Sequence, residues 1–455
     1  MMMKDKRFIL AGVLLLIFVS GCATAIRSTD WPEPSEFGQG LPTYPAPLDS
    51  ENKNSAEEFE EPTGEITLSE AFAAALLNNP RLAGYAWTVR VREAQSLQTS
   101  LLPNPEIEIE VEEFGGSGDL SGFDATETTI LFSQLIELGQ KRQKRTSVAQ
   151  LNQDLAAWDY EAARVSVLTD VSRALINVLS FQERNKMMQQ NLDLANKVYG
   201  AIEKRVNAGA ASPLDLTKAR VEVAKERIGL QRNHRDLKSA RIQLATTWGS
   251  EKVQFTQVKG NFSTLSVLPS IETLSERIAQ NPQVARWAAE IIQRKAEIEY
   301  EESKSVSDME IGLGVRRLEE LDDVAAVFNI SIPLTVFNRN QGSIREANYE
   351  LEVAHHLKRE AELQINTKLS RSYEKLSGAF EEIKALEAEL LPAAKQAYDD
   401  THTAYTEGKV GYLQVLDAQR TLFEARSQHL EALVIYNAVA VEIEGLIGLP
   451  LSAMN

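Results

Sequence analysis

The chain contains the same long pattern twice, and this duplication limits the possible folds more than any other feature. In each copy, a short alternating segment leads into a long helical segment that is interrupted only by a glycine-containing turn. The turn glycines, Gly209 and Gly408, lie 199 residues apart, and at that offset Leu214 matches Leu413. This period is too long for a solenoid repeat, so it indicates a duplicated half-molecule.

The two copies suggest where each half begins and ends. We expect one half at 65–255 and the other at 273–450, joined by a connector at 256–272. The offset of 199 extends into the alternating segments, where it matches Leu131 with Ile330. Each half would then consist of a helix, a β-hairpin and a long helical hairpin.

Residues 1–21 have the pattern of a secretory signal. Basic residues precede an apolar run from Phe8 to Val19, which is too short to cross a membrane as a helix. The small residues before Cys22 resemble a bacterial lipobox, which implies cleavage before Cys22 and acylation of its thiol. An ordinary secretory signal with an incidental cysteine is the alternative. Cys22 is the only cysteine, so a disulfide framework is excluded.

The stretch from 22 to 64 is rich in proline and has little periodicity. It predicts an extended tether between the lipid and the folded body, although simple disorder predicts nearly the same. Ala23 stands where lipoproteins kept in the inner membrane commonly have aspartate, which favours the outer membrane.

Charge and motifs exclude several classes of function. The net charge of −17 argues against nucleic acid as a partner. The chain contains no Walker loop, zinc-protease motif, nucleophile elbow or dinucleotide fingerprint, so we expect no enzyme. The five histidines lack the spacing of metal ligands, so we expect no metal site, and no cofactor other than the lipid on Cys22.

Two β-hairpins are expected, at about 105–137 and 308–335. Residues 106–112 read EIEIEVE, which predicts a strand with one apolar and one polar face. If the apolar face meets lipid, the glutamates line the lumen of a barrel, although any water-filled pore needs polar residues. These glutamates are Glu106, Glu108, Glu110 and Glu112.

The sequence does not decide which side of the return strand at 125–136 is the apolar one. Ile130 and Phe132 lie on one side, and Leu131 and Leu135 lie on the other. Four strands of this length can cross a bilayer at a tilt, but they cannot close a barrel alone. Open edges in lipid leave backbone groups unpaired, so several protomers would have to share one barrel. Three protomers would supply twelve strands. Ordinary hairpins in water are the alternative.

Long helices complete each half. From Gln140 to about Arg205 there is no proline, and apolar or small residues recur with the spacing of a coiled-coil seam. Such a segment makes a helix of roughly 100 Å. Pro213 starts a return helix that ends near Trp248, and the second half repeats the design with Pro392 as an interruption. A soluble coiled coil or bundle, anchored only by its lipid, is the alternative.

This architecture resembles the TolC-like outer-membrane efflux family over about 66–449. The most specific stretches are the strand-to-helix junctions, 132–142 with its Leu-Gly-Gln-Lys-Arg sequence, and 332–340 with its Ile-Pro-Leu and Phe-Asn-Arg-Asn sequences. The lipobox and the first junction are most similar to the branch that serves heavy-metal efflux pumps, and drug-efflux members share much of this.

The resemblance implies a mainly α-helical fold with a small β part. Two tandem repeats of coiled-coil helices and β-hairpins would form a homotrimer, with a twelve-stranded β-barrel in the outer membrane on a periplasmic α-helical barrel. It implies a passive exit duct, for heavy-metal cations or alternatively for drugs. It also implies a periplasmic adaptor and an inner-membrane pump, of the proton-driven RND type.

The resemblance also implies roles for the two helical turns. Residues at these tips would contact the adaptor, and residues just beyond them would line a periplasmic constriction. Asp215 lies near a helix start, so simple stabilisation of the helix is an equal alternative for it. Gln414 stands where some relatives carry an aspartate, which weakens a full acidic ring. The tip residues are Gly209, Ser212, Gly408 and Gly411, and the constriction residues are Asp215, Gln414 and Asp417.

Overall fold

A computed structural model describes residues 36–37, 40–44, 46, 61–266 and 268–451. The chain divides into two compact units, Met1–Asp30 and Trp31–Asn455. The first unit, which includes the expected signal and Cys22, lies outside the described residues. All described residues belong to the second unit.

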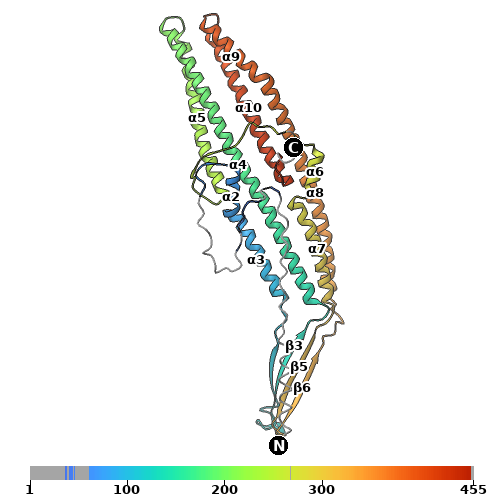
Figure 1. The fold of residues 1–455 in the computed structure, drawn as a ribbon. Coiled ribbons are helices and arrows are strands. Elements are labelled where there is room, and N and C mark those ends of the chain that lie inside the picture. The colour runs from blue at the N-terminus through green and yellow to red at the C-terminus, as the bar shows by residue number, and fades with distance from the viewer. Residues whose placement is uncertain (1–35, 38–39, 45, 47–60, 267, 452–455) are drawn as a thin grey trace. The chain divides into compact units, whose positions relative to one another are not determined.

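Long helices dominate this unit (Figure 1). Two helical hairpins stand side by side at one end, and shorter helices pack along their lower halves. Helix α4 has 67 residues, which corresponds to about 100 Å of unbroken helix. The helices are α2 (Leu68–Asn78), α3 (Pro80–Ser100), α4 (Lys141–Asn207), α5 (Pro213–Thr246), α6 (Ile271–Ile278), α7 (Pro282–Ser303), α8 (Gln341–Ala385), α9 (Leu391–Thr406) and α10 (Tyr412–Ile447).

Local sequence signals explain where several helices start. Thr67 and Glu70 form a reciprocal capping box at the start of α2, as the sequence predicts. Asn79 then ends α2 and caps α3, with Pro80 as the first residue of α3. Asn281 and Pro282 repeat this arrangement at the start of α7.

A four-stranded antiparallel sheet lies at the other end, in the order β2-β3-β5-β6. The two predicted hairpins lie side by side, because β3 pairs with β5. In the described chain, the outer edges of β2 and β6 have no strand partner. The strands are β2 (Glu106–Glu112), β3 (Glu127–Ile136), β5 (Met309–Leu318) and β6 (Asp323–Ser331). The expected class, mainly α with a small β part in two tandem repeats, is confirmed.

The register of the sheet corrects one match between the repeats. Leu131 pairs with Gly314 on one face, whereas Ile330 pairs with Ile311 on the other face. The offset of 199 is therefore wrong for the strands, since a shift of one residue turns every side chain to the opposite face. The N-caps of α4 and α8, Gln140 and Asn340, both adopt the left-handed conformation and give an offset of 200 at these junctions.

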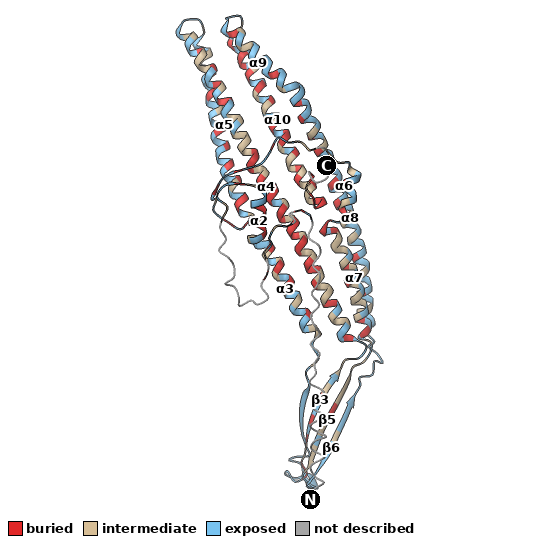
Figure 2. Ribbon diagram, in the orientation of Figure 1, coloured by how far each residue is buried: buried red, intermediate tan, exposed pale blue. Residues whose placement is uncertain are grey.

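Buried residues form seams along the helices, whereas the outer strands β2 and β6 are exposed along almost their whole length (Figure 2). The larger apolar cluster joins both halves around the middle of the unit, and it includes Leu168, Leu244, Leu376 and Ile443. A second cluster lies toward the tips and includes Ile202 and Val415, among others. The packed core therefore belongs to the helices.

The second half contains a π-helical turn that the sequence does not reveal. This turn, Leu386–Leu390, connects α8 to α9 and ends two residues before Pro392. Proline has no backbone N–H and its ring crowds the carbonyl four residues earlier, so a local widening of the helix relieves the clash. The expected interruption at Pro392 is thus a change of pitch within a continuing helix.

The described part of 22–64 contacts the helical body. Phe37 is buried against Phe72, with ring centroids 5.6 Å apart, and its N–H donates to the Gly448 carbonyl. Arg164, in a buried ion pair with Glu161, donates to the Phe37 carbonyl. The sequence predicts an extended tether and gives no sign of this docking.

The sequence does not predict a short parallel pair of strands, β1 (Gly64–Ile66) and β4 (Phe255–Val258). β1 lies where the expected tether meets the first half. β4 lies where the first half meets the expected connector. Ile66 and Val258 are buried in the larger cluster, so this pair fastens the entry of the chain to the core.

Replacement of Gly314 by alanine should disrupt the sheet. An added Cβ would overlap the Ile130 carbonyl oxygen and lie 2.9 Å from the Leu131 Cα, so backbone would have to move. We expect a loss of about 1–3 kcal/mol in stability, measured by thermal unfolding in detergent. Gly378→Ala is the control, since nothing lies within 4 Å of that site. It should stabilise α8 by about 0.5–1 kcal/mol. Equal stability of both variants would contradict the register.

Candidate functional site: a two-faced sheet and two helical tips

One face of the four-stranded sheet is apolar and exposed. Cross-strand pairing places Ile107 beside Phe132, then Leu313 and Phe328, in one continuous row. A second row contains Ile109, and 66% of that residue's surface is exposed. Exposed apolar surface of this extent is typical of contact with a membrane or another protein. The second row is Ile109, Ile130, Val315 and Ala326.

This pairing resolves the open facing of β3. Ile130 and Phe132 lie on the apolar face, and Leu131 lies on the glutamate face opposite Glu108. Leu131 is nevertheless only 7% exposed, because it covers the bare backbone of Gly312. A leucine on the polar face is thus withdrawn from solvent.

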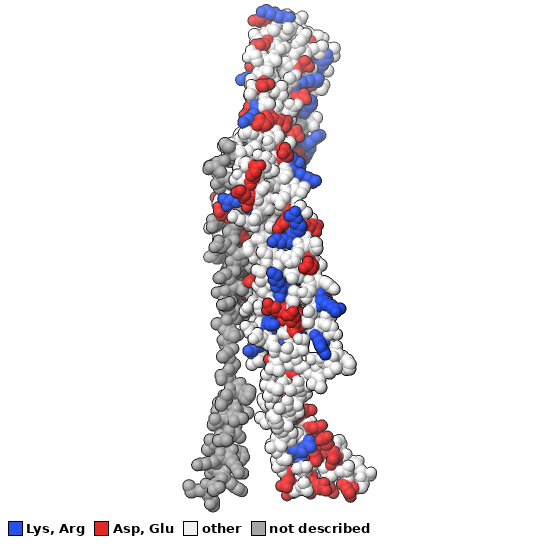
Figure 3. Space-filling view, turned by 90° about the vertical axis from the view of Figure 1, so that its right-hand side faces the viewer, with Lys and Arg blue, Asp and Glu red and all other residues white. Residues whose placement is uncertain are grey.

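The other face is acidic. Glu106, Glu108, Glu110 and Glu112 are all exposed and point to this face, as the alternation predicts. Pairing adds three further carboxylates from the neighbouring strands, namely Glu127, Glu310 and Asp323. Figure 3 shows that acidic atoms outnumber basic ones at this end of the unit.

Arg316 is a basic residue on the acidic face, and sequence reasoning missed its role. Its Nη1 donates to Glu127 Oε2 at 2.7 Å, and its Nε donates to Thr129 Oγ1 at 2.9 Å. Its Nη2 lies 3.6 Å from Glu112 Oε2. Arg316 therefore joins β5 to β3 and β2. Arg316 alternates along β5 on the same side as Gly312 and Gly314, and this pattern could have indicated the face on which it lies.

The first helical tip is the turn between α4 and α5. Gly209 has a φ of 72°, which favours glycine, and the Ser212 hydroxyl accepts from the Leu214 N–H at 3.2 Å. The Asp215 N–H donates to the Ser212 carbonyl at 3.0 Å, so Asp215 lies in the first turn of α5 and is partly buried. This position suits a carboxylate because the helix dipole stabilises negative charge there.

The second tip is the turn between α9 and α10. Gly408 has a φ of 78°, and Gly411 caps α10. A Cβ on Gly411 would approach the Gln414 amide oxygen to 3.3 Å, so the side chain of Gln414 lies back over the turn. Asp417 is exposed one turn further on and makes no ion pair with any described residue. Its charge raises the pKa of Arg420, after the larger effect of Glu222.

Two arginines connect the hairpins near the tips, and the sequence gives no signal for either contact. Arg205 on α4 donates to the Tyr405 carbonyl on α9, and its guanidinium lies 4.5 Å from the centroid of the Tyr405 ring. Arg420 on α10 pairs with Glu222 on α5. Burial raises the pKa of Tyr412, which lies between these contacts, to about 12.

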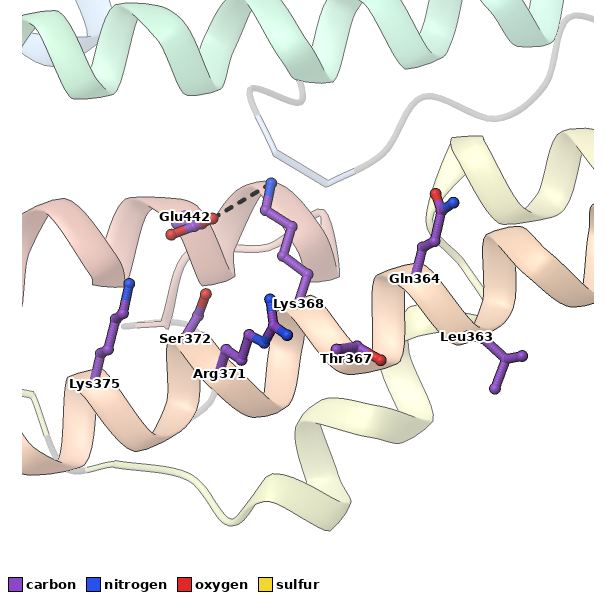
Figure 4. A pocket seen from close by; sticks show the side chains of 8 residues that line it. All are labelled: Leu363, Gln364, Thr367, Lys368, Arg371, Ser372, Lys375 and Glu442. Atoms are coloured by element: carbon purple, nitrogen blue, oxygen red, sulfur yellow. Dashed lines mark ion pairs between the residues drawn. The ribbon is translucent and has the colours of Figure 1, made fainter.

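A groove of about 470 Å³ lies between α8 and α10 (Figure 4). Its basic residues are Lys368, Arg371 and Lys375, and Lys368 Nζ lies 3.4 Å from Glu442 Oε1. Among the described residues, no three His, Cys, Asp or Glu side chains gather as metal ligands would. No helix in the described parts of the chain is both long enough and apolar enough to cross a membrane.

Comparison with known families identifies the fold. The family model described as "Outer membrane efflux protein" matches residues 72–250 and 273–449, and each range falls within one of the two predicted halves. The chain belongs to this family. Its function is therefore that of an outer-membrane exit duct in efflux, and the family is not one of enzymes.

Relatives of known role agree with this assignment. The cobalt-zinc-cadmium resistance protein CzcC of Cupriavidus metallidurans is 32% identical over 85% of this chain and 91% of its own length. The cation efflux system protein CusC of Escherichia coli K12 is 23% identical over 78% of this chain and 81% of its own. The pyoverdine export protein OpmQ of Pseudomonas aeruginosa is 24% identical over 90% of this chain and 91% of its own.

Solved structures share the fold. A membrane protein from Pseudomonas aeruginosa superimposes with a TM-score of 0.72 and 20% identity, covering 84% of this chain and 92% of its own. The CusC structure superimposes with a TM-score of 0.69 and 18% identity, covering 90% of this chain and 98% of its own. At such identities the likeness concerns the fold alone.

Removal of the Arg205 side chain should loosen both tips. Arg205→Ala removes the donor to the Tyr405 carbonyl and the cation over its ring, which together are worth about 1–3 kcal/mol. We expect faster amide hydrogen exchange in the turns at 208–212 and 407–411. Lys204→Ala, at an exposed neighbour, is the control. If both variants exchange alike, Arg205 does not hold the tips together.

Proposed function

We propose that three copies of the chain share one twelve-stranded barrel in the outer membrane and continue as a helical tube into the periplasm. The carrying observation is the four-stranded sheet with two unpaired edges, one apolar face and one acidic face. Pairing of β6 of one copy with β2 of the next would satisfy the edges. The apolar face would then meet lipid and the acidic face would line the lumen.

The membrane anchor and the partners are part of the same proposal. The lipid would be attached at Cys22, and residues 22–64 would connect it to the body at the docked Phe37. A periplasmic adaptor and a proton-driven inner-membrane pump of the RND type would deliver the cargo. The duct itself would carry it passively.

We propose roles for the tips on the same basis. Gly209, Ser212, Gly408 and Gly411 would form the turns that the adaptor contacts. Asp215, Gln414 and Asp417 would line the constriction just beyond. Asp417 supports this role best, because it is exposed and free of ion pairs within the described chain, so three copies would place three carboxylates around the axis.

Heavy-metal cations are the proposed cargo. Support comes from the metal-resistance and cation-efflux roles of the relatives CzcC and CusC, and from the excess of carboxylates on the proposed lumen face. A duct for small organic molecules is the second candidate, because OpmQ matches nine-tenths of the chain and exports pyoverdine.

A charge on the proposed lipid face should prevent insertion. Ile109→Asp would place three carboxylates in hydrocarbon, at a cost of up to about 2 kcal/mol each. We expect loss of the detergent-extracted trimer from the outer membrane, measured by fractionation and mass. Glu108→Gln, on the opposite face of the same strand, should assemble normally. Normal assembly of Ile109→Asp would contradict the proposed barrel and favour a lipid-anchored periplasmic scaffold.

Growth of a deletion strain should reveal the cargo. We expect lower tolerance of cobalt, zinc, cadmium or nickel, restored by the wild-type gene. Tolerance of antibiotics, dyes and detergents is the comparison. Sensitivity to these compounds without sensitivity to metals would keep the duct and reject the metal cargo.

A further inference from the structure

Helix α5 has two coiled-coil seams on opposite faces. The first seam is buried against α4 and contains Ala219, Val223 and Leu230. Val221 and Ile228 each lie two residues from members of that seam, about 200° around the helix. They are 59% and 58% exposed. A second apolar seam therefore faces away from the other residues that the structure describes.

The spacing of this second seam is that of a coiled coil. Its members recur at intervals of three and four residues over the half of α5 nearest the tip, and all are exposed and uncharged. They are Leu214, Thr217, Val221, Ala224 and Ile228. At the matching positions of α10, Arg420 and Ser427 replace Val221 and Ile228, and Leu416 is buried, so α10 has no such continuous exposed apolar seam.

Helix α9 has the complementary free face. Within the unit, α5 contacts α4, α4 contacts α10, and α10 contacts α9, so α5 and α9 are the two flanks of this row (Figure 1). Ala394, Tyr398 and Tyr405 form the buried side of α9. The residues two positions away are exposed, and with the neighbouring Asp399 they form a polar and acidic face. These residues are Gln396, Asp399, Asp400 and Thr403.

Charge favours the contact between the two flanks. Helix α5 carries eight basic and four acidic residues, whereas the π-helical turn and α9 together carry four acidic and one basic. Lys218, Arg220, Asp399 and Asp400 flank the two free faces. None of the four makes an ion pair with any residue that the structure describes, although Asp400 accepts from the Gln396 amide at 2.8 Å.

The charged residues on the two helices lie at matching distances from the helical tips. Helix α5 runs away from the tips and α9 runs toward them, so the pairing would be antiparallel. Lys218 lies five residues into α5 and Asp400 lies six residues before the end of α9, which places both about 8–9 Å from their tips. Arg220 and Asp399 each lie seven residues, or about 10 Å, from their tips.

We propose that the exposed seam of α5 packs against α9 of a second copy of this chain, with Lys218 pairing with Asp400 and Arg220 with Asp399 across the junction. This inference rests on the proposed trimer and specifies how its helical tube closes. The apolar seam would lose its exposed surface, and the four free charges would gain partners.

Thiol cross-linking of the full-length chain in isolated membranes tests the junction. Lys218→Cys with Asp400→Cys should give covalent dimers and trimers with a short bis-maleimide linker on a denaturing gel, and each single variant should not. The background is favourable because Cys22 is the only native cysteine. Glu222→Cys with Arg420→Cys is the matched control, because these residues pair within one copy and should cross-link without a change in mass.

The outcomes separate this inference from the trimer itself. If the wild type is a trimer by mass and the control pair reacts, but the Lys218/Asp400 pair gives no covalent oligomer, the junction is wrong and the trimer stands. If the wild type is a monomer, both are wrong. As a further check, Lys218→Asp should lower the fraction of trimer several-fold, and Lys218→Asp with Asp400→Lys should restore it. Failure of the swap would overturn the ion pair.

Discussion

The unpaired backbone groups along β2 and β6 are the constraint on which the rest of the structure depends. β2 has seven residues and β6 has nine, so each edge leaves several N–H and C=O groups without partners in the described sheet. Each such group costs several kcal/mol in hydrocarbon. The sum exceeds the about 5–15 kcal/mol by which a typical protein is stable. A single copy therefore cannot hold this sheet in a membrane, and closure with further copies is the solution that satisfies the edges.

The duplication places a strand hairpin and a long helix in each repeat, so that closure of the strands also involves the helices. Two similar hairpins pair through β3 and β5, and each continues into a long helix through a left-handed cap, at Gln140 and at Asn340. The sheet and the helical hairpins therefore share one repeat. In the proposed assembly, the symmetry that closes the strands would also bring the flanks α5 and α9 of neighbouring copies together, so one assembly would form both barrel and tube.

Much of this fold could be predicted from the sequence because its strongest signals are local. The alternation of 106–112, the capping box at Thr67 and Glu70, and the glycine turns each follow from neighbouring residues. The register between the repeats could not, because an offset that matches the tips is off by one at the strands, where one residue reverses the face. The facing of β3 needed its partners, since only Gly312 explains how Leu131 can lie on the polar face.

Contacts between distant segments were the part that the sequence could not reveal. The docking of Phe37 joins it to Arg164 and Gly448, and Arg205 meets Tyr405 across 200 residues. Neither contact has a local pattern. Among the candidate site residues, the alternation along a strand predicts which face each residue occupies, Arg316 included. The partners of Arg316 on β3 and β2 follow only from the pairing of three strands.

The charges of the sheet bear on how far such a duct could select its cargo. Seven carboxylates and Arg316 lie on the proposed lumen face of each copy, and Arg316 offsets the charge of Glu127 and Glu112 beside it. At physiological salt, a wall charge acts over only about 8 Å. An acidic wall would thus concentrate any cation near it, whether a metal ion or an organic cation, without distinguishing them. Recognition requires ligands of defined geometry, and no such cluster occurs among the described residues. On the proposed assembly, the duct would therefore favour cations over anions, and a pump and an adaptor would be the parts that distinguish one cation from another.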